Sequence, residues 1–84
     1  MPLNQPISSL QGRTVWVVGA SAGIGQALAQ QALAQRARLV VSGRRAQALS
    51  EAFPSADVRR EVLDITKGGG AQRVLDALAA DGWL

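Results

Sequence analysis

Apolar residues form two kinds of pattern along this chain, and each change of pattern predicts a new element. Short apolar runs rich in β-branched residues occupy positions 13–18 (RTVWVV) and 38–42 (RLVVS). A third run, DVRREVLDIT, occupies positions 57–66 and is strongest over 58–63. Runs of this kind are typical of strands buried on both faces of a parallel sheet. The pattern therefore predicts three strands.

Between and after these runs, the apolar residues follow a helical period. Helices are expected over residues 24–35, over about 46–53, and after the break KGGG at 67–70. Pro54 ends the second helix, because proline pushes the residue before it out of the α region. An amphipathic helix places its apolar residues on one face toward a core. The residues expected on such faces are Leu28, Ala29, Ala32 and Leu33 in the first helix and Val74, Leu75, Leu78 and Ala79 in the third.

The predicted elements alternate strictly between strand and helix. This order implies an α/β fold with parallel strands and right-handed crossovers. One small domain is expected over residues 10–84. Residues 1–9, which contain two prolines and two serines and no periodic pattern, are expected to form a flexible arm.

Composition removes several kinds of chemistry. The 84 residues, 48% hydrophobic and 18% charged, indicate a globular chain. The sequence has no cysteine and no histidine. It therefore lacks disulfides, thiolate ligands, the commonest general base and the commonest zinc ligand, and we expect no metal site.

Three glycines stand where the first strand passes into the first helix, in VVGASAGIGQAL at residues 17–28. Each glycine weakens regular structure by roughly 0.5–1 kcal/mol relative to alanine, so three together indicate a specific backbone requirement. In a strand–turn–helix context, Gly19 would allow a sharp turn, Gly23 would let backbone amides approach a pyrophosphate, and Gly25 would let the helix pack closely. The helix N-terminus would add unpaired N–H groups and partial positive charge. An ordinary tight turn is the alternative interpretation.

The spacing of these glycines resembles an element of the short-chain dehydrogenase/reductase family. That family carries T-G-x-x-x-G-I-G, and the chain matches it from Gly19 to Gly25, with Val18 in place of the threonine. The lead-in LQGRTVWVVGAS and the segment VVSGRR are also similar, so the resemblance covers residues 10–84. It implies a three-layer, Rossmann-like βαβαβα half-domain whose parallel sheet has the strand order 3-2-1. It also implies a dinucleotide-binding site.

The resemblance further implies which residues contact the cofactor. Gly43 occupies the position where an acidic residue would select NAD, and Arg44 and Arg45 follow it with guanidinium groups that suit the 2′-phosphate of NADP. Ser21 would donate another hydrogen bond, so NADP is expected over NAD. The alternative is two solvated arginines at the start of a surface helix. The expected cofactor-binding residues are Gly19, Ser21, Ala22, Gly23, Ile24, Gly25, Gly43, Arg44, Arg45, Asp64 and Ile65.

Asp64 and Ile65 follow the third strand. By the same resemblance, the Asp64 carboxylate would accept from the adenine amino group, and the next backbone amide would contact the ring. The alternative is a strand-end aspartate that caps a turn.

The residues of the family's chemistry are missing from this chain. The family uses a catalytic tyrosine and lysine spaced Y-x-x-x-K, together with a serine, to relay the substrate proton. This sequence has no tyrosine and a single lysine, Lys67. We therefore expect the NADP(H)-binding half of a dehydrogenase, without catalytic residues and inactive alone. The alternative is a non-catalytic half-domain that binds a nucleotide or a partner.

Charge adds a third function class. A net charge of +3 and several arginines suggest nucleic acid, yet the only aromatic residues are Trp16, Phe53 and Trp83. Few aromatics remain for stacking on bases, so this class is not favoured. With neither a secretory signal pattern nor an apolar run of membrane-spanning length, a cytoplasmic location is expected and no membrane contact.

The first strand bears on assembly. With strand order 3-2-1, residues 14–18 form an edge whose backbone groups are unpaired and whose side chains are apolar. Such an edge is a template for pairing with another chain. We expect a homo-oligomer, in the simplest case a two-fold dimer. The alternative is a monomer with Trp16 partly exposed.

Overall fold

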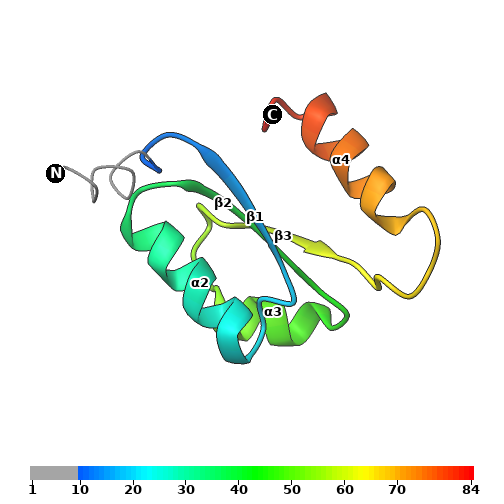
Figure 1. Cartoon of the computed structure of the whole chain (residues 1–84), viewed down its shortest axis with the longest axis horizontal. Coiled ribbons are helices and arrows are strands. Elements are labelled where there is room, and N and C mark those ends of the chain that lie inside the picture. Colours follow the sequence, from blue (N-terminus) through cyan, green and yellow to red (C-terminus); the bar gives the residue numbers. More distant parts are fainter. Residues whose placement is uncertain (1–9) are drawn as a thin grey trace, which may run out of the picture.

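The computed structural model describes residues 10–84, and the expected arm at residues 1–9 lies outside the described residues. Three strands alternate with three helices, as the sequence predicts (Figure 1). The elements are β1 (Thr14–Val18), α2 (Gly23–Ala34), β2 (Arg38–Gly43), α3 (Ala46–Ala52), β3 (Arg59–Val62) and α4 (Gly70–Ala80).

All three strands are parallel, and β2 lies between β1 and β3. Val17 of β1 lies opposite Val41 of β2, and Val41 in turn lies opposite Arg60 of β3. The predicted strand order 3-2-1 is therefore confirmed. Figure 1 shows α2 and α3 together on one side of the sheet and α4 on the other, which gives three layers.

Successive side chains of β2 divide the core between the two faces of the sheet, because side chains alternate along a strand. Leu39 and Val41 belong to a cluster with residues of α2 and α3, which we call the α2–α3 cluster. Val40 points the other way, into the α4 cluster. The α4 cluster consists of Val40, Leu63, Val74 and Leu78, with Trp16 and Trp83 packed against it.

The strands differ in burial. From Leu39 to Gly43 β2 is buried, whereas β1 is half-buried from Thr14 to Val17 and Val18 is 43% exposed. The expectation that the first run is buried on both faces is therefore wrong. Within residues 10–84, β1 pairs with β2 on one side only, so its other side lacks neighbours.

Some predicted boundaries and faces also differ from the structure. β3 is four residues long instead of spanning 57–66, because Val58 N–H donates to the Ser55 carbonyl in a turn before it. A second turn follows the strand at Asp64. Leu28, predicted to face the core, is 54% exposed, because the side of α2 toward β1 has little to pack against.

The chain after α4 is fixed to the amino-terminal ends of the strands. The Arg38 guanidinium lies 4.4 Å from the centre of the Trp83 ring, and Thr14 Oγ1 donates to the Trp83 carbonyl at 2.7 Å. Arg59 forms a salt bridge of 2.7 Å with Asp81. These contacts hold α4 on its face of the sheet. None of the helices in residues 10–84 has the length and apolar character needed to cross a membrane.

Candidate nucleotide-binding site

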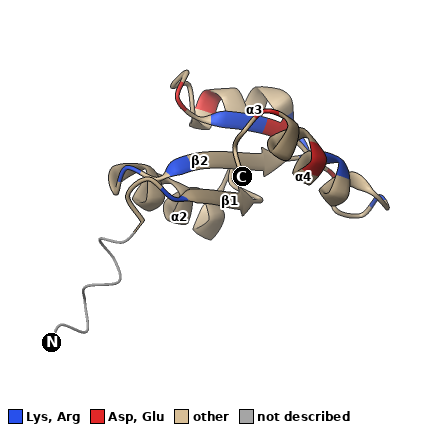
Figure 2. Ribbon diagram, turned by 90° about the horizontal axis from the view of Figure 1, so that it is seen from above, with Lys and Arg blue, Asp and Glu red and all other residues tan. Residues whose placement is uncertain are grey.

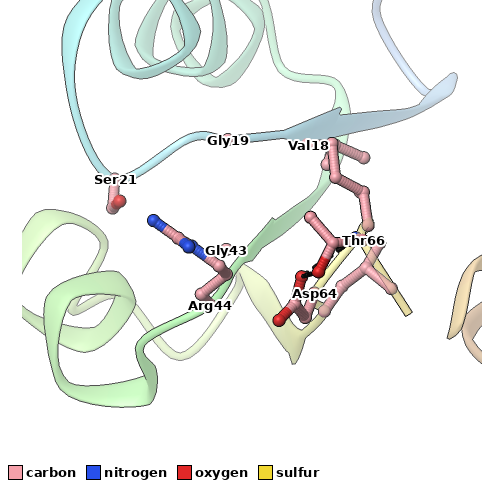
Figure 3. Close-up of a pocket in the computed structure, with 9 residues that line it drawn as sticks. Val18, Gly19, Ser21, Gly43, Arg44, Asp64 and Thr66 are labelled. Atoms are coloured by element: carbon pink, nitrogen blue, oxygen red, sulfur yellow. Dashed lines mark hydrogen bonds between the residues drawn. The ribbon is translucent and has the colours of Figure 1, made fainter.

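The carboxyl-terminal ends of the three parallel strands meet at one edge of the sheet and border an open pocket of about 400 Å³. In open α/β sheets, ligands bind in the crevice at this edge. Figure 3 shows the side chains that surround it. The lining residues are Val18, Gly19, Ser21, Gly43, Arg44, Leu63, Asp64, Ile65 and Thr66.

The loop from Gly19 to Gly25, here called the glycine loop, begins with a turn that glycine favours. Gly19 has a φ of 81° and Gly23 a φ of 62°, both in the left-handed region. An added Cβ at Gly25 would collide with the Gly19 carbonyl oxygen and lie 2.9 Å from the carbonyl carbon. These three positions therefore need glycine for the turn and for close packing of α2.

The N-terminus of α2 is open. Its N-cap residue, Ala22, is extended, and no side chain caps the helix. The first turn closes only with the Gln26 N–H donating to the Ala22 carbonyl at 3.4 Å. The preceding amides have no carbonyl in an earlier turn to bind. Together with the helix dipole, these amides can bind an anion such as a phosphate group.

Ser21 lies in the glycine loop after β1, Arg44 directly follows β2, and both line the pocket. Figure 3 shows the Arg44 guanidinium directed toward Ser21. Gly43 lies between the two segments, and a Cβ there would be 3.7 Å from Ser21 Oγ. Within residues 10–84 no carboxylate forms a salt bridge with Arg44. The pair therefore offers a hydroxyl and an exposed guanidinium, which are hydrogen-bond donors suited to a phosphate.

Asp64 closes the turn that follows β3. Its Oδ1 accepts from the Thr66 hydroxyl at 2.6 Å and from the Thr66 N–H at 2.9 Å (Figure 3). These two hydrogen bonds hold the pKa of the Asp64 carboxyl below its ordinary value, and the charges of Lys67 and Arg44 act in the same direction. The turn-capping role that the sequence left open is therefore present.

The structure brings together six of the expected residues, namely Gly19, Ser21, Gly43, Arg44, Asp64 and Ile65. Ala22, Gly23, Ile24, Gly25 and Arg45 do not line the pocket. Ile24 is 80% exposed in the first turn of α2, and Arg45 is the exposed N-cap residue of α3.

Three lining residues were not among the expected ones, namely Val18, Leu63 and Thr66. Each lies within four residues of the carboxyl end of a strand. That position is the signal that could have identified them, because the ends of parallel strands share one edge of a sheet. The part of the chain that the structure describes holds no cluster of potential metal ligands.

The arginines do not form one basic face. Figure 2 shows basic and acidic residues distributed over several elements. Arg38 and Arg59 lie against Trp83, and Arg60 donates to the carbonyls of Phe53 and Ser55 at 2.7 and 3.0 Å. These side chains are engaged in holding the fold, which does not favour a nucleic-acid surface.

Comparison with known proteins identifies solved structures with a similar fold. No protein-family model matches this sequence, and no curated protein sequence matches it. Among solved structures, a 2-keto-3-deoxy-D-gluconate dehydrogenase from Streptococcus agalactiae matches 92% of the chain with a TM-score of 0.75 and 21% identity. A proposed gluconate dehydrogenase from Agrobacterium tumefaciens matches 90% of it with a TM-score of 0.81 and 25% identity.

Both neighbours are named as dehydrogenases. The resemblance drawn from the glycine motif is therefore confirmed as a likeness of structure, and the fold is that of a Rossmann-like half-domain. The chain spans 32% of the length of each neighbour.

Proposed function

We propose that this chain is the NADP(H)-binding portion of an oxidoreductase of the short-chain dehydrogenase/reductase type. The observation that carries the proposal is the pocket at the strand ends, where Arg44 and Ser21 face each other across Gly43 (Figure 3). The dinucleotide pyrophosphate lies against the glycine loop and the uncapped N-terminus of α2. The 2′-phosphate lies between Arg44 and Ser21.

The absence of a side chain at Gly43 supports NADP over NAD. A carboxylate at this point would accept from a free ribose 2′-hydroxyl and repel a 2′-phosphate. Gly43 is buried, and a Cβ there would approach Leu49 Cδ2 to 3.3 Å. Arg44 follows Gly43 in the pocket lining, and its guanidinium favours the phosphate.

At the adenine end, Asp64 has a second carboxylate oxygen besides the one that caps the turn. Oδ1 accepts both hydrogen bonds from Thr66. In the proposed complex, Oδ2 accepts from the adenine amino group, and the Ile65 backbone amide contacts the ring. The lowered pKa of Asp64 keeps this acceptor ionised at neutral pH.

Calorimetric titration with NADP⁺ and NAD⁺ tests the proposal, and Arg44→Ala is the decisive variant. A charge-assisted hydrogen bond contributes about 1.5–3 kcal/mol, so we expect Arg44→Ala to weaken NADP⁺ binding by roughly 10- to 100-fold. NAD⁺ binding should change little. Arg45→Ala removes the same charge one residue away, outside the pocket lining, and should have a clearly smaller effect. Equal affinities for the two nucleotides in the unmodified chain would contradict the proposal.

We also propose that this chain binds nucleotide without turning over a substrate. It contains no tyrosine, so the proton relay of the family cannot be built from its residues. Purified chain supplied with NADPH and a carbonyl substrate should show no oxidation of the cofactor. Turnover by homogeneous protein would contradict this.

A second candidate property is self-association through β1. Beside this edge strand lies a groove of about 460 Å³. Its lining is Leu10, Val15, Val17, Leu28, Gln31, Ala32 and Gln35. An edge strand with apolar side chains pairs readily with another strand, and two copies related by a two-fold axis would cover both edges.

Sedimentation at micromolar concentration tests self-association. The expected result is a species heavier than the 8.8 kDa monomer, shifted toward monomer by Val17→Lys on the edge. Ala71→Lys adds the same charge on the exposed side of α4 and should leave the mass unchanged. A monomer in all three proteins would contradict the idea.

A further inference from the structure

Ser42, near the end of β2, is the one fully buried polar residue within residues 10–84. Its side chain lies on the same face of the sheet as Val40, which belongs to the α4 cluster. A buried hydroxyl costs free energy unless it is hydrogen-bonded. An apolar residue at this position would avoid that cost. The hydrogen bonds that Ser42 makes therefore indicate why a serine is present here.

The backbone of Ser42 holds the start of the glycine loop. Its carbonyl oxygen accepts from the Gly19 N–H at 2.7 Å and from the Ala20 N–H at 3.1 Å. The next two residues, Gly43 and Arg44, line the pocket. Ser42 therefore joins the two segments between which the 2′-phosphate is proposed to lie.

The side chain of Ser42 fixes the edge strand. Its Oγ accepts from the Trp16 Nε1–H at 2.8 Å. Ser42 is paired with Val18 in the register, so this bond runs diagonally across the β1–β2 pair. β1 has no partner on its other side among the described residues, and the indole bond adds a lateral restraint close to the point where the glycine loop begins.

We propose that Ser42 is a positioning residue of the pocket, acting with Trp16 to hold Ser21 at a fixed separation from Arg44. The inference rests on the proposed function, because it assigns the pair a role in binding the 2′-phosphate. The 5′-phosphate contacts the glycine loop alone, so its binding depends less on this separation. The 2′-phosphate contacts both segments and depends on it directly.

The test compares two probes, adenosine 2′,5′-bisphosphate and adenosine 5′-monophosphate, by calorimetry on the 84-residue chain. In Ser42→Ala the ratio of the two affinities should fall by about three- to tenfold, the worth of one hydrogen bond. Trp16→Phe keeps an aromatic ring without the donor and should lower the ratio similarly. The double variant should lose no more than either single variant, because one bond is removed in all three.

The control is Val40→Ala, a truncation two residues earlier on the same buried face of β2. It should lower the midpoint of denaturant unfolding without changing the affinity ratio, which separates positioning from stability. A spectroscopic measurement accompanies the binding data. The NMR signal of the Trp16 indole N–H should shift when adenosine 2′,5′-bisphosphate is added and should move in the free Ser42→Ala chain.

An unchanged ratio in folded Ser42→Ala and Trp16→Phe, with the unmodified chain still preferring the bisphosphate, would overturn the inference alone. The same holds if Val40→Ala lowers the ratio as much as Ser42→Ala does. Failure of the unmodified chain to bind either probe would overturn the proposed function as well.

Discussion

β1 and β2 are neighbouring strands of similar apolar sequence, yet they lie in different environments. Val17 and Val41 face each other in the register and point to the same α2–α3 cluster. Val41 is fully buried, whereas Val17 is only partly buried. Within residues 10–84, β2 has a strand on each side and a helix layer on each face, while β1 has a strand on one side only.

The difference in burial between Val17 and Val41 shows that a short apolar run predicts a strand but does not predict which strands lie beside it in the sheet. The number of partners that a strand has in the sheet decides how much of the same side chain leaves water. The two strands also divide the site between them, since β1 leads into the glycine loop and β2 leads into Arg44. The more buried strand thus serves as the support from which the edge strand is positioned.

The largest expected change in the free energy of unfolding comes from truncating a valine to alanine on each of the two strands. Val41→Ala should lower the free energy of unfolding by about 2–3 kcal/mol, because a fully buried side chain loses its contacts and leaves a cavity. Val17→Ala should cost about 1 kcal/mol, since part of that side chain is already in water. Urea denaturation of both variants measures the difference. Equal losses would mean that the edge of β1 is covered in solution.

Gly25 lies in the first turn of α2, after β1, and Gly43 is the last residue of β2. For these two glycines the larger loss is expected on the β1 side, opposite to the order of the valines. Gly25→Ala places a Cβ against the backbone of Gly19, which cannot move without opening the turn, and should cost about 1–3 kcal/mol. It should also weaken nucleotide binding. Gly43→Ala meets the flexible Leu49 side chain at 3.3 Å and should cost less than about 1 kcal/mol. Thermal unfolding followed by circular dichroism ranks the two variants, and the reverse order would contradict the packing described.

The connection between the strands offers a smaller change of opposite sign. Arg36 lies between α2 and β2 with a φ of 65°, a conformation that favours glycine at the end of a helix. Arg36→Gly should therefore raise the free energy of unfolding by about 0.5–1 kcal/mol. Arg13→Gly, an exposed arginine that precedes β1, is a control for the lost charge and should not stabilise the chain. A loss of stability in Arg36→Gly would contradict the assignment.

The smallest expected effect is on the pH dependence of stability. It concerns the turn after β3, which lies outside both β1 and β2. Because the Thr66 hydrogen bonds lower the pKa of Asp64 in the folded chain, their contribution to stability is present above the unfolded pKa of about 4. It is lost as the pH falls through the lower, folded pKa. Thr66→Val should raise the pKa of Asp64 toward its ordinary value, as an NMR titration of the carboxyl would show. The stability difference between the two proteins should be present at pH 7 and disappear in acid.

The alternation of short apolar runs with helical patterns was sufficient to predict the order of elements and the parallel sheet. Local sequence could predict these because β-branched runs and amphipathic periods are local properties. The glycine spacing also located the turn after the first strand, because positive φ and close packing require that residue type at Gly19 and Gly25.

The features that were not predicted depend on tertiary neighbours. The exposure of Leu28 follows from how little the side of α2 toward β1 has to pack against. The indole–hydroxyl bond between Trp16 and Ser42 joins two strands and has no signature in either segment. Val18 and Thr66 enter the pocket only because three strand ends meet.

Trp16 and Trp83 are the only tryptophans in the sequence, which has no tyrosine, and both pack on the α4 side of the sheet. Ultraviolet emission of this chain therefore comes from one layer of the molecule. The α2–α3 cluster, whose one aromatic residue is Phe53, contributes almost no emission. If α2 and α3 loosened before α4, circular dichroism would record the loss of helix while the emission stayed native. Comparing the two signals during unfolding thus measures whether the layers on opposite faces of one three-stranded sheet come apart together.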